Sequence, residues 1–211
     1  TTGQVAQIGW SGSTFLLGMQ LDGELLGSSA VIAFPKGQPG VHLDVNGKLN
    51  GQAIKHLRLL TGRQNKIVVW GDDGSTAQNL AGLATADMGK SWAAQPNSTP
   101  GGKLKPTASS VDGNTLVATS DDNQQVAVST DGGTSWTAQP SLSSAQNAAV
   151  YVTAKSKKAV VALDNGTYAV KNGKWTRITS KLAINLSDNG SANGTRLWAV
   201  DAQGQVIWLD D

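Results

Sequence analysis

The sequence contains no cysteine, a single glutamate (Glu24), few aromatic residues and no long hydrophobic run. The lack of cysteine excludes disulfide bonds and thiolate metal sites, and it fits either a cytosolic protein or an exported bacterial one. No apolar segment approaches the roughly 20 residues that a transmembrane helix requires, so we expect no membrane span. The first residues show no signal-peptide pattern, so we expect any export signal to have been removed.

Charged residues are also scarce, at 15% of the 211 residues, and the formal net charge is +2. The basic residues are scattered apart from "KSKK" at residues 155–158, so the sequence predicts no nucleic-acid partner. Serine, threonine, asparagine, glutamine and glycine dominate the polar residues. This composition predicts an all-β protein with many turns and a sizeable core. It also favours a secreted, periplasmic or cell-surface location.

Five apolar runs, each ending in an acidic turn, recur along the chain at intervals of 37 to 50 residues. Such runs, closed by Asp-Gly, Asn-Gly or Asp-Asn, are typical of a strand that enters a hairpin. They end at Asp22, Asp72, Asp121, Asp164 and Asp201. Further strand-like segments flank these runs. The unit is therefore four short antiparallel strands over about 45 residues, which predicts the blades of a β-propeller.

We predict a single β-propeller domain over residues 1–211, with five blades or as part of a larger propeller. The expected blades cover approximately residues 1–50, 51–101, 102–142, 143–182 and 183–211. The last range holds only three strand-like segments. An N-terminal strand from "GQVAQIGW" could complete it, since propellers often hide their open edge in this way.

Two eight-residue segments, "TADMGKSW" (Thr85–Trp92) and "STDGGTSW" (Ser129–Trp136), repeat a hydroxyl residue, Asp, Gly and Trp at the same relative positions. Both match the pattern Ser/Thr-x-Asp-x-Gly-x-x-Trp and resemble the Asp-box, or bacterial neuraminidase repeat. "AVKNGKW" at residues 169–175 resembles a degenerate third copy. The resemblance implies a propeller of a class that includes sialidases, sorting receptors and photosystem assembly factors.

The chemistry of the repeated segment predicts a structural turn between the third and fourth strands. Its Asp accepts hydrogen bonds from turn amides, its Gly adopts a positive φ, and its Ser or Thr hydroxyl adds a local bond. Its Trp packs between strands with the indole N–H satisfied. We assign this structural role to Thr85, Asp87, Gly89, Trp92, Ser129, Asp131, Gly133 and Trp136.

The resemblance implies that these turns lie away from the ligand site, and that the loops between second and third strands help to build the ligand face. Our alignment places exposed turn carboxylates there, and the candidate ligand-binding residues are Asp72, Asp73, Asp121 and Asp122. They could bind a cation, a cationic ligand or sugar hydroxyls, although Asp favours hairpin turns for backbone reasons alone. Trp10, beside a Gly/Ser turn, is a further candidate as a platform for a sugar ring.

The sequence predicts no metal site and no cofactor. It lacks the Asp-x-Asp-x-Asp loop with a trailing bidentate Glu that is typical of a calcium site. His42 and His56 alternate with apolar residues on predicted strands, and neither has a second His or Cys at metal-ligand spacing. We interpret both histidines as polar strand positions.

The resemblance also raises the hypothesis of a glycoside hydrolase, because sialidases use three arginines, a Tyr/Glu nucleophilic pair and an Asp acid/base. The residues available for these roles, besides Asp, are Arg58, Arg63, Arg177, Arg196, Tyr151, Tyr168 and Glu24. The sequence therefore offers almost no choice of residues for the catalytic roles of a sialidase. The sequence therefore favours a non-catalytic recognition or scaffold propeller that binds a glycan or a protein partner. A sialidase-like hydrolase and a structural subunit of a surface or viral assembly are the alternatives.

Overall fold

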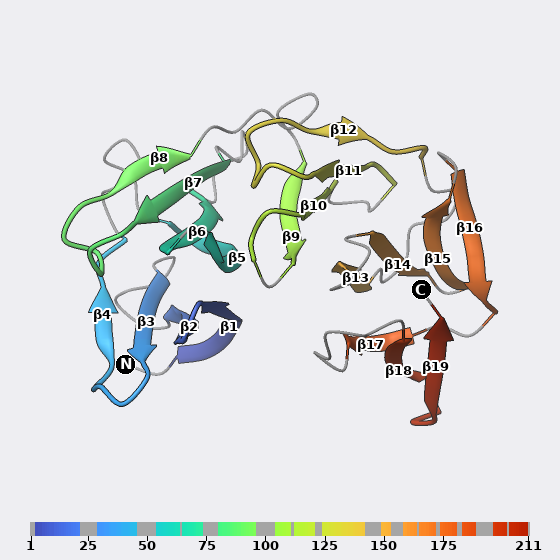
Figure 1. The fold of residues 1–211 in the computed structure, drawn as a ribbon, viewed down its shortest axis with the longest axis horizontal. Coiled ribbons are helices and arrows are strands. Elements are labelled where there is room, and N and C mark those ends of the chain that lie inside the picture. Colours follow the sequence, from blue (N-terminus) through green and yellow to red (C-terminus); the bar gives the residue numbers. More distant parts are fainter. Residues whose placement is uncertain are drawn as a thin grey trace. The chain divides into compact units, whose positions relative to one another are not determined.

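The computed structural model shows short β-strands joined by turns (Figure 1). The residues that it describes are 3–21, 29–45, 54–63, 65–73, 80–95, 104–110, 112–120, 124–141, 149–152, 158–163, 165–171, 174–180, 183–188, 196–201 and 203–210. Within these ranges every regular element is a strand and there is no helix. The all-β class predicted from the sequence is therefore confirmed.

The first two sheets are four-stranded antiparallel meanders, in which strands pair in chain order. The first contains β1 (Gly3–Ser11), β2 (Thr14–Leu21), β3 (Ser29–Pro35) and β4 (Val41–Leu43). The second contains β5 (His56–Arg63), β6 (Lys66–Asp72), β7 (Leu80–Thr85) and β8 (Ala93–Gln95). Since β1 pairs with β2, the N-terminal strand belongs to the first sheet and is not the closing strand of the last.

The other three sheets repeat this pattern. The third contains β9 (Lys105–Ser109), β10 (Leu116–Thr119), β11 (Val126–Ser129) and β12 (Thr137–Ala138). The fourth contains β13 (Ala149–Val152), β14 (Ala159–Leu163), β15 (Gly166–Lys171) and β16 (Lys174–Thr179). The fifth has three strands among the described residues, β17 (Ala183–Asp188), β18 (Arg196–Asp201) and β19 (Val206–Asp210). A four-stranded meander of this kind is the blade of a β-propeller.

The chain divides into two compact units, and each is described by itself. Unit 1 comprises Thr1–Ser98, Val111–Asn114 and Asp131–Thr134. Unit 2 comprises Thr99–Ser110, Thr115–Thr130 and Ser135–Asp211. The first two sheets therefore lie in unit 1, and the strands of the other three sheets lie in unit 2.

The core of unit 1 forms where the first and second sheets pack against each other. The buried residues of this cluster include Leu16, Val31, Ala33 and Leu43 from the first sheet and Leu57, Leu60, Ile67, Val69 and Leu83 from the second. Glycine permits the close approach of β1 and β5, because a Cβ on Gly9 would lie only 2.2 Å from the carbonyl oxygen of Leu60. Unit 2 has an equivalent cluster, in which Val117 of the third sheet packs with Val161 of the fourth.

A β-bulge recurs near the start of the first strand in four of the five described sheets. The extra, unpaired residues are Ala6 in β1, Arg58 in β5, Thr107 in β9 and Ile184 in β17. In β5 the bulge lets Leu57 and Leu60 share the core face although they are three residues apart, since residues of a regular strand share a face only at even spacing. The bulge is thus a repeated feature of the architecture, and the residue that occupies it varies.

Candidate ligand-binding site

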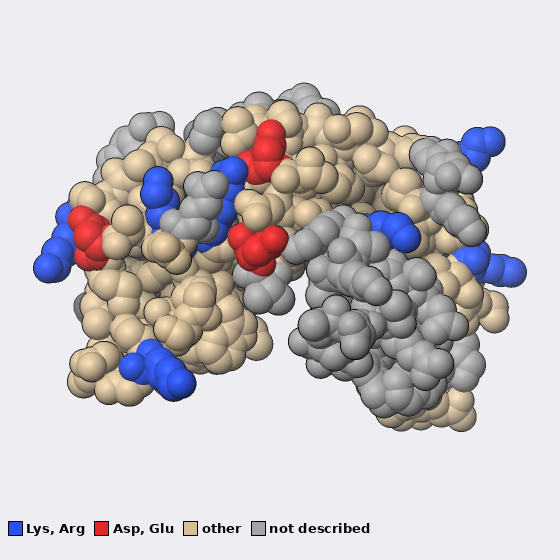
Figure 2. Space-filling view, viewed as in Figure 1, with Lys and Arg blue, Asp and Glu red and all other residues tan. Residues whose placement is uncertain are grey.

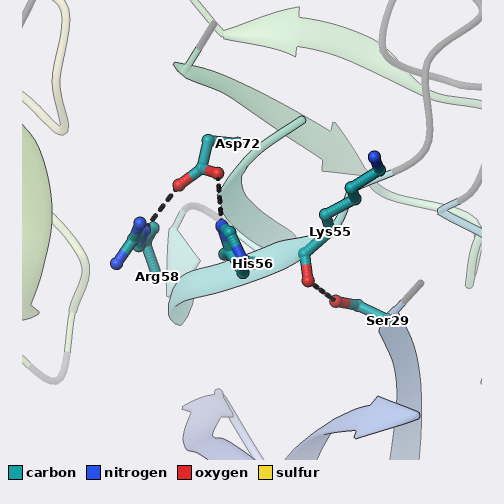
Figure 3. Close-up of polar contacts among 5 residues, drawn as sticks. All are labelled: Ser29, Lys55, His56, Arg58 and Asp72. Carbon is teal, nitrogen blue, oxygen red and sulfur yellow. Dashed lines mark hydrogen bonds and ion pairs between the residues drawn. The ribbon is translucent and has the colours of Figure 1, made fainter. Parts of the chain in front are cut away.

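Asp72 is a buried carboxylate at the end of β6, directly opposite His56 at the start of β5. Its side chain is 0% exposed, and a buried charge is stable only when it is paired and hydrogen-bonded. Oδ1 lies 2.7 Å from Nδ1 of His56, and Oδ2 accepts a bond of 2.6 Å from Nε of Arg58 (Figure 3). We call these three residues the Asp72 cluster.

The bulge explains how two residues of one strand reach the same carboxylate. His56 is paired with Asp72, whereas Arg58 is the extra residue between the paired positions of Leu57 and Leu59. Both leucines are buried, and a bulge redirects the side chains beside it. The local sequence thus anchors β5 with its leucines and turns two basic side chains toward the end of β6.

The backbone around the cluster is also tied down. The Lys55 amide donates to the carbonyl oxygen of Asp72 at 2.8 Å. The Ser29 hydroxyl, from β3 of the first sheet, donates to the carbonyl oxygen of Lys55 at 3.3 Å (Figure 3). The backbone at the start of β5, directly before His56, is therefore held from both sheets of unit 1.

The two basic partners of Asp72 reach solvent, since the side chain of His56 is 53% exposed and that of Arg58 is 29% exposed. A carboxylate only accepts hydrogen bonds, so the contact with Asp72 places a proton on Nδ1 of His56. Within the described part of the chain, no residue bonds to Nε2 of His56 or to the terminal nitrogens of Arg58. The cluster therefore presents a guanidinium fork and an imidazole nitrogen.

This arrangement suits the binding of a polar or anionic group. Arg binds planar anions through two parallel N–H bonds, and it does so best when its side chain is already oriented. Among the coloured residues of the face drawn in Figure 2, charged side chains are few and scattered. A His–Asp pair also occurs in hydrolase triads, but in the described residues no hydroxyl bonds to His56.

The predicted ligand-binding aspartates differ in their positions. Asp72 belongs to a strand and Asp73 is only 7% exposed, so our expectation of exposed turn carboxylates is wrong for both. The reason is that β6 continues to the end of its apolar run. Asp121 and Asp122 lie outside the described residues, and in the third sheet Thr119 takes the register position of Asp72. A role for the four in ligand binding stays a prediction.

From the sequence alone, Arg58 enters only the inventory for a hydrolase and His56 is interpreted as a polar strand position, so neither is predicted as a ligand-binding residue. Their partner is 14 to 16 residues away and is reached only through the strand pairing and the bulge. The available signal was the segment "KHLRLL", in which two basic residues alternate with apolar ones at a strand start.

Trp10 lies on an exposed row of aromatic residues in the first sheet. It is 54% exposed and stands opposite Phe15, with the ring centroids 5.1 Å apart in an edge-to-face arrangement. Phe15 in turn stands opposite Phe34. Its use as a sugar platform stays a prediction.

The segment Thr85–Trp92 forms the turn between β7 and β8, at the far end of the sheet from Asp72, because Thr85 pairs with Ile67 while Asp72 pairs with Leu80. Asp87 Oδ1 accepts the Ser91 amide at 2.9 Å and the Thr85 hydroxyl at 2.8 Å. The Thr85 hydroxyl oxygen accepts the Gly89 amide at 2.8 Å. Asp87, Thr85 and Ser91 thus form a local network, which we call the Asp87 turn.

The hydrogen bonds of the Ser91 side chain and amide, followed by that of Thr85, lower the pKa of Asp87 to about 2. Gly89 adopts φ +85°, and Met88 before it adopts φ +58°. In the second copy the corresponding residues, Gly133 and Gly132, adopt φ +91° and +70°. Two successive positive φ values thus shape both turns.

The tryptophans of the repeated segments differ in their hydrogen bonding. Trp92 packs against the core of unit 1, but its Nε1 is buried and has no partner among the described residues. Our expectation of a satisfied indole N–H is therefore wrong for Trp92. Trp175, in the degenerate copy, donates to the carbonyl oxygen of Pro140 at 2.6 Å.

A cleft of about 220 Å³ lies beside the Asp87 turn, lined among others by Ser11, Asn65, Thr85 and Met88. The residues that line it carry no formal charge. Within the described ranges, no three His, Cys, Asp or Glu side chains gather closely enough to hold a metal ion. The same ranges contain no helix with the length and hydropathy of a membrane span.

No protein-family model and no curated protein matches the sequence. The fold, however, is similar to that of solved β-propellers. YCF48 bound to D1 peptide matches with a TM-score of 0.65 at 13% identity, over 99% of this chain and 64% of that chain. YCF48 from Cyanidioschyzon merolae matches with a TM-score of 0.62 at 13% identity, over 97% of this chain and 68% of that chain. A chain of the nidogen/laminin complex matches with a TM-score of 0.61 at 10% identity, over 98% of this chain and 75% of that chain.

Structural matches at identities this low show the fold alone. The matches and the four-stranded antiparallel sheets together establish that the protein is a multi-blade β-propeller. The chain spans less than two thirds of the YCF48 chain in the first of these structures.

Proposed function

We propose that this propeller is a non-catalytic binding module that takes a protein or peptide partner at the Asp72 cluster. The observation that carries the proposal is a buried carboxylate that fixes two side chains, Arg58 and His56, which both reach solvent. A rigid framework with a preset polar group lowers the entropic cost of binding. Such sites suit recognition, because their donors are oriented before the ligand binds.

Similarity of fold supports a protein or peptide partner by analogy. YCF48 bound to D1 peptide and the nidogen/laminin complex are both assemblies of a propeller with another chain. A location outside the cytoplasm, and membership of the Asp-box class, belong to the same proposal. The hydrogen bonds of the Asp87 turn support the latter.

Glycan binding is a second candidate, and a specific observation favours it. Trp10 is half exposed beside Phe15, and exposed aromatic faces stack on sugar rings. This surface lies on β1 and β2, apart from the Asp72 cluster on β5 and β6. The two candidates therefore respond to different substitutions.

Capture of displayed ten-residue peptides by the full chain tests the proposal, with a glycan array in parallel. We expect Arg58→Lys to lose most of the capture, because Lys keeps the charge beside Asp72 but has no fork. Arg177→Lys, at an exposed arginine of β16, is the matched control and should bind like the wild type. If Arg58→Lys captured peptides as well as Arg177→Lys does, the assignment of the binding site to the Asp72 cluster would be contradicted. Retention of glycans that depends on Trp10, with no peptide captured, would replace the proposal with the second candidate.

A further inference from the structure

We infer that the group recognised by the Asp72 cluster is a carboxylate of the partner peptide, held by the two terminal nitrogens of Arg58 in one site per chain. The inference rests on the proposed function and names the chemistry of its ligand. A carboxylate has two sources in a peptide, an acidic side chain or the C-terminus, and both present the same two oxygens.

The first step is the edge of the guanidinium that remains available. Arg has five N–H donors in one plane, and Asp72 accepts from the Nε–H at 2.6 Å. The four N–H groups on the terminal nitrogens bond to no residue in the described ranges. One N–H group on each terminal nitrogen points away from Nε, and these two parallel groups have the spacing of the two oxygens of a carboxylate. The buried anchor therefore leaves the forked end of Arg58 for a ligand.

The second step is the charge of the cluster. The Arg58 charge is balanced by Asp72, so a ligand anion meets one cation and one buried anion behind it. His56 and the exposed Lys55 are the other basic groups at this strand start. Because the charges of Arg58 and Asp72 cancel, a bound carboxylate leaves an excess of one negative charge beside the buried Asp72, whereas a doubly charged phosphate leaves an excess of two. The smaller excess favours a carboxylate.

The third step is a comparison with the other sheets. The bulge that places Arg58 also occurs in β1, β9 and β17, where the extra residues are Ala6, Thr107 and Ile184. None of these side chains can bind an anion through a charged fork. The same backbone device thus carries a guanidinium at Arg58 and an uncharged side chain at these three positions. The expected stoichiometry is one carboxylate per chain and not one per blade.

Three matched pools of ten-residue peptides test the inference with the full chain. One pool has an internal Glu and an amidated C-terminus, the second has no acidic residue and a free C-terminus, and the third has Gln and an amidated C-terminus. We expect the third pool to be captured about 10- to 100-fold less than at least one of the others, as for a charge-assisted pair. Titration of the best peptide should saturate at one per chain.

The outcomes separate this inference from the proposed function. Preference for the first pool assigns a side-chain carboxylate, and preference for the second assigns the C-terminus. Equal capture of all pools that is lost in Arg58→Lys would overturn the carboxylate and leave the peptide-binding function standing. No capture of any pool would contradict the function itself. His56→Gln, with exposed His42→Gln as its control, should weaken capture of the preferred pool by less than Arg58→Lys does.

Discussion

The second sheet holds two aspartates at opposite ends that use their carboxylates in different ways. Asp72 is buried and is bound by two basic side chains that lie 14 and 16 residues away. Asp87 accepts from Thr85 and Ser91, two and four residues away, in a turn at the surface. Asp87 therefore organises its own turn, whereas Asp72 organises groups that reach outward from another strand.

The difference teaches that aspartates at the two ends of one blade can form either a local network within a turn or a long-range network between strands. A local network satisfies backbone amides that would otherwise lack partners. A long-range network fixes side chains whose remaining donors face solvent, and such preset donors are what a ligand site requires. Substitutions at the two ends should therefore have different signatures.

The largest expected effect is that of Asp72→Ala, which leaves Arg58 and His56 without their shared acceptor. Loss of one partner of a buried ion pair is strongly destabilising. Because both basic groups reach solvent and can be hydrated, we expect a loss of about 2 to 3 kcal/mol in the free energy of unfolding. Urea denaturation measures it. A loss below about 0.5 kcal/mol would show that the buried carboxylate does not anchor the cluster.

Thr85→Val should have the next largest effect, at the other end of the sheet. The Thr85 hydroxyl is buried, accepts the Gly89 amide and donates to Asp87. Its removal leaves that amide without an acceptor, which costs about 1 to 2 kcal/mol. Thr176→Val, at an exposed position of β16, is the control. Peptide capture by Thr85→Val should equal that of the wild type. A selective loss of capture would contradict the assignment of a purely structural role to the Asp87 turn.

The smallest effect should be the dependence of stability on pH that Asp87 contributes. Its pKa is lowered from 3.8 to about 2 in the fold, so the ionised form is favoured by folding. The contribution is therefore complete above about pH 4 and is lost as the pH falls toward 2. The difference in unfolding free energy between wild type and Asp87→Asn should shrink over that window. A difference that is constant from pH 5 to pH 2 would contradict the assigned bonds.

The same contrast explains how much the sequence could predict. The hairpins and the Asp87 turn follow from residues within four positions of each other, so their pattern is visible in the chain. The partners of Asp72 depend on which residues face each other across β5 and β6, and the bulge at Arg58 shifts that register by one residue. Asp72 is buried because β6 extends to it. The sequence Asp-Asp-Gly is typical of a turn, so the pattern predicts that the strand ends earlier.

Two further differences have the same origin. The pairing of β1 with β2 places the N-terminal strand in the first sheet, which local patterns could not decide because strand partners are chosen by packing. The indole N–H of Trp92 lacks a partner among the described residues, whereas that of Trp175 finds Pro140 from the segment that follows β12. Such contacts depend on neighbouring sheets and not on the turn that carries the Trp.

The most direct test of the account is a ¹⁵N NMR titration of the arginine side chains in the full chain, with the best captured peptide as the probe. The account predicts that the terminal-nitrogen signals of Arg58 shift and saturate at one peptide per chain, while those of Arg177 do not move. Saturable binding of the peptide with unchanged Arg58 signals would contradict it.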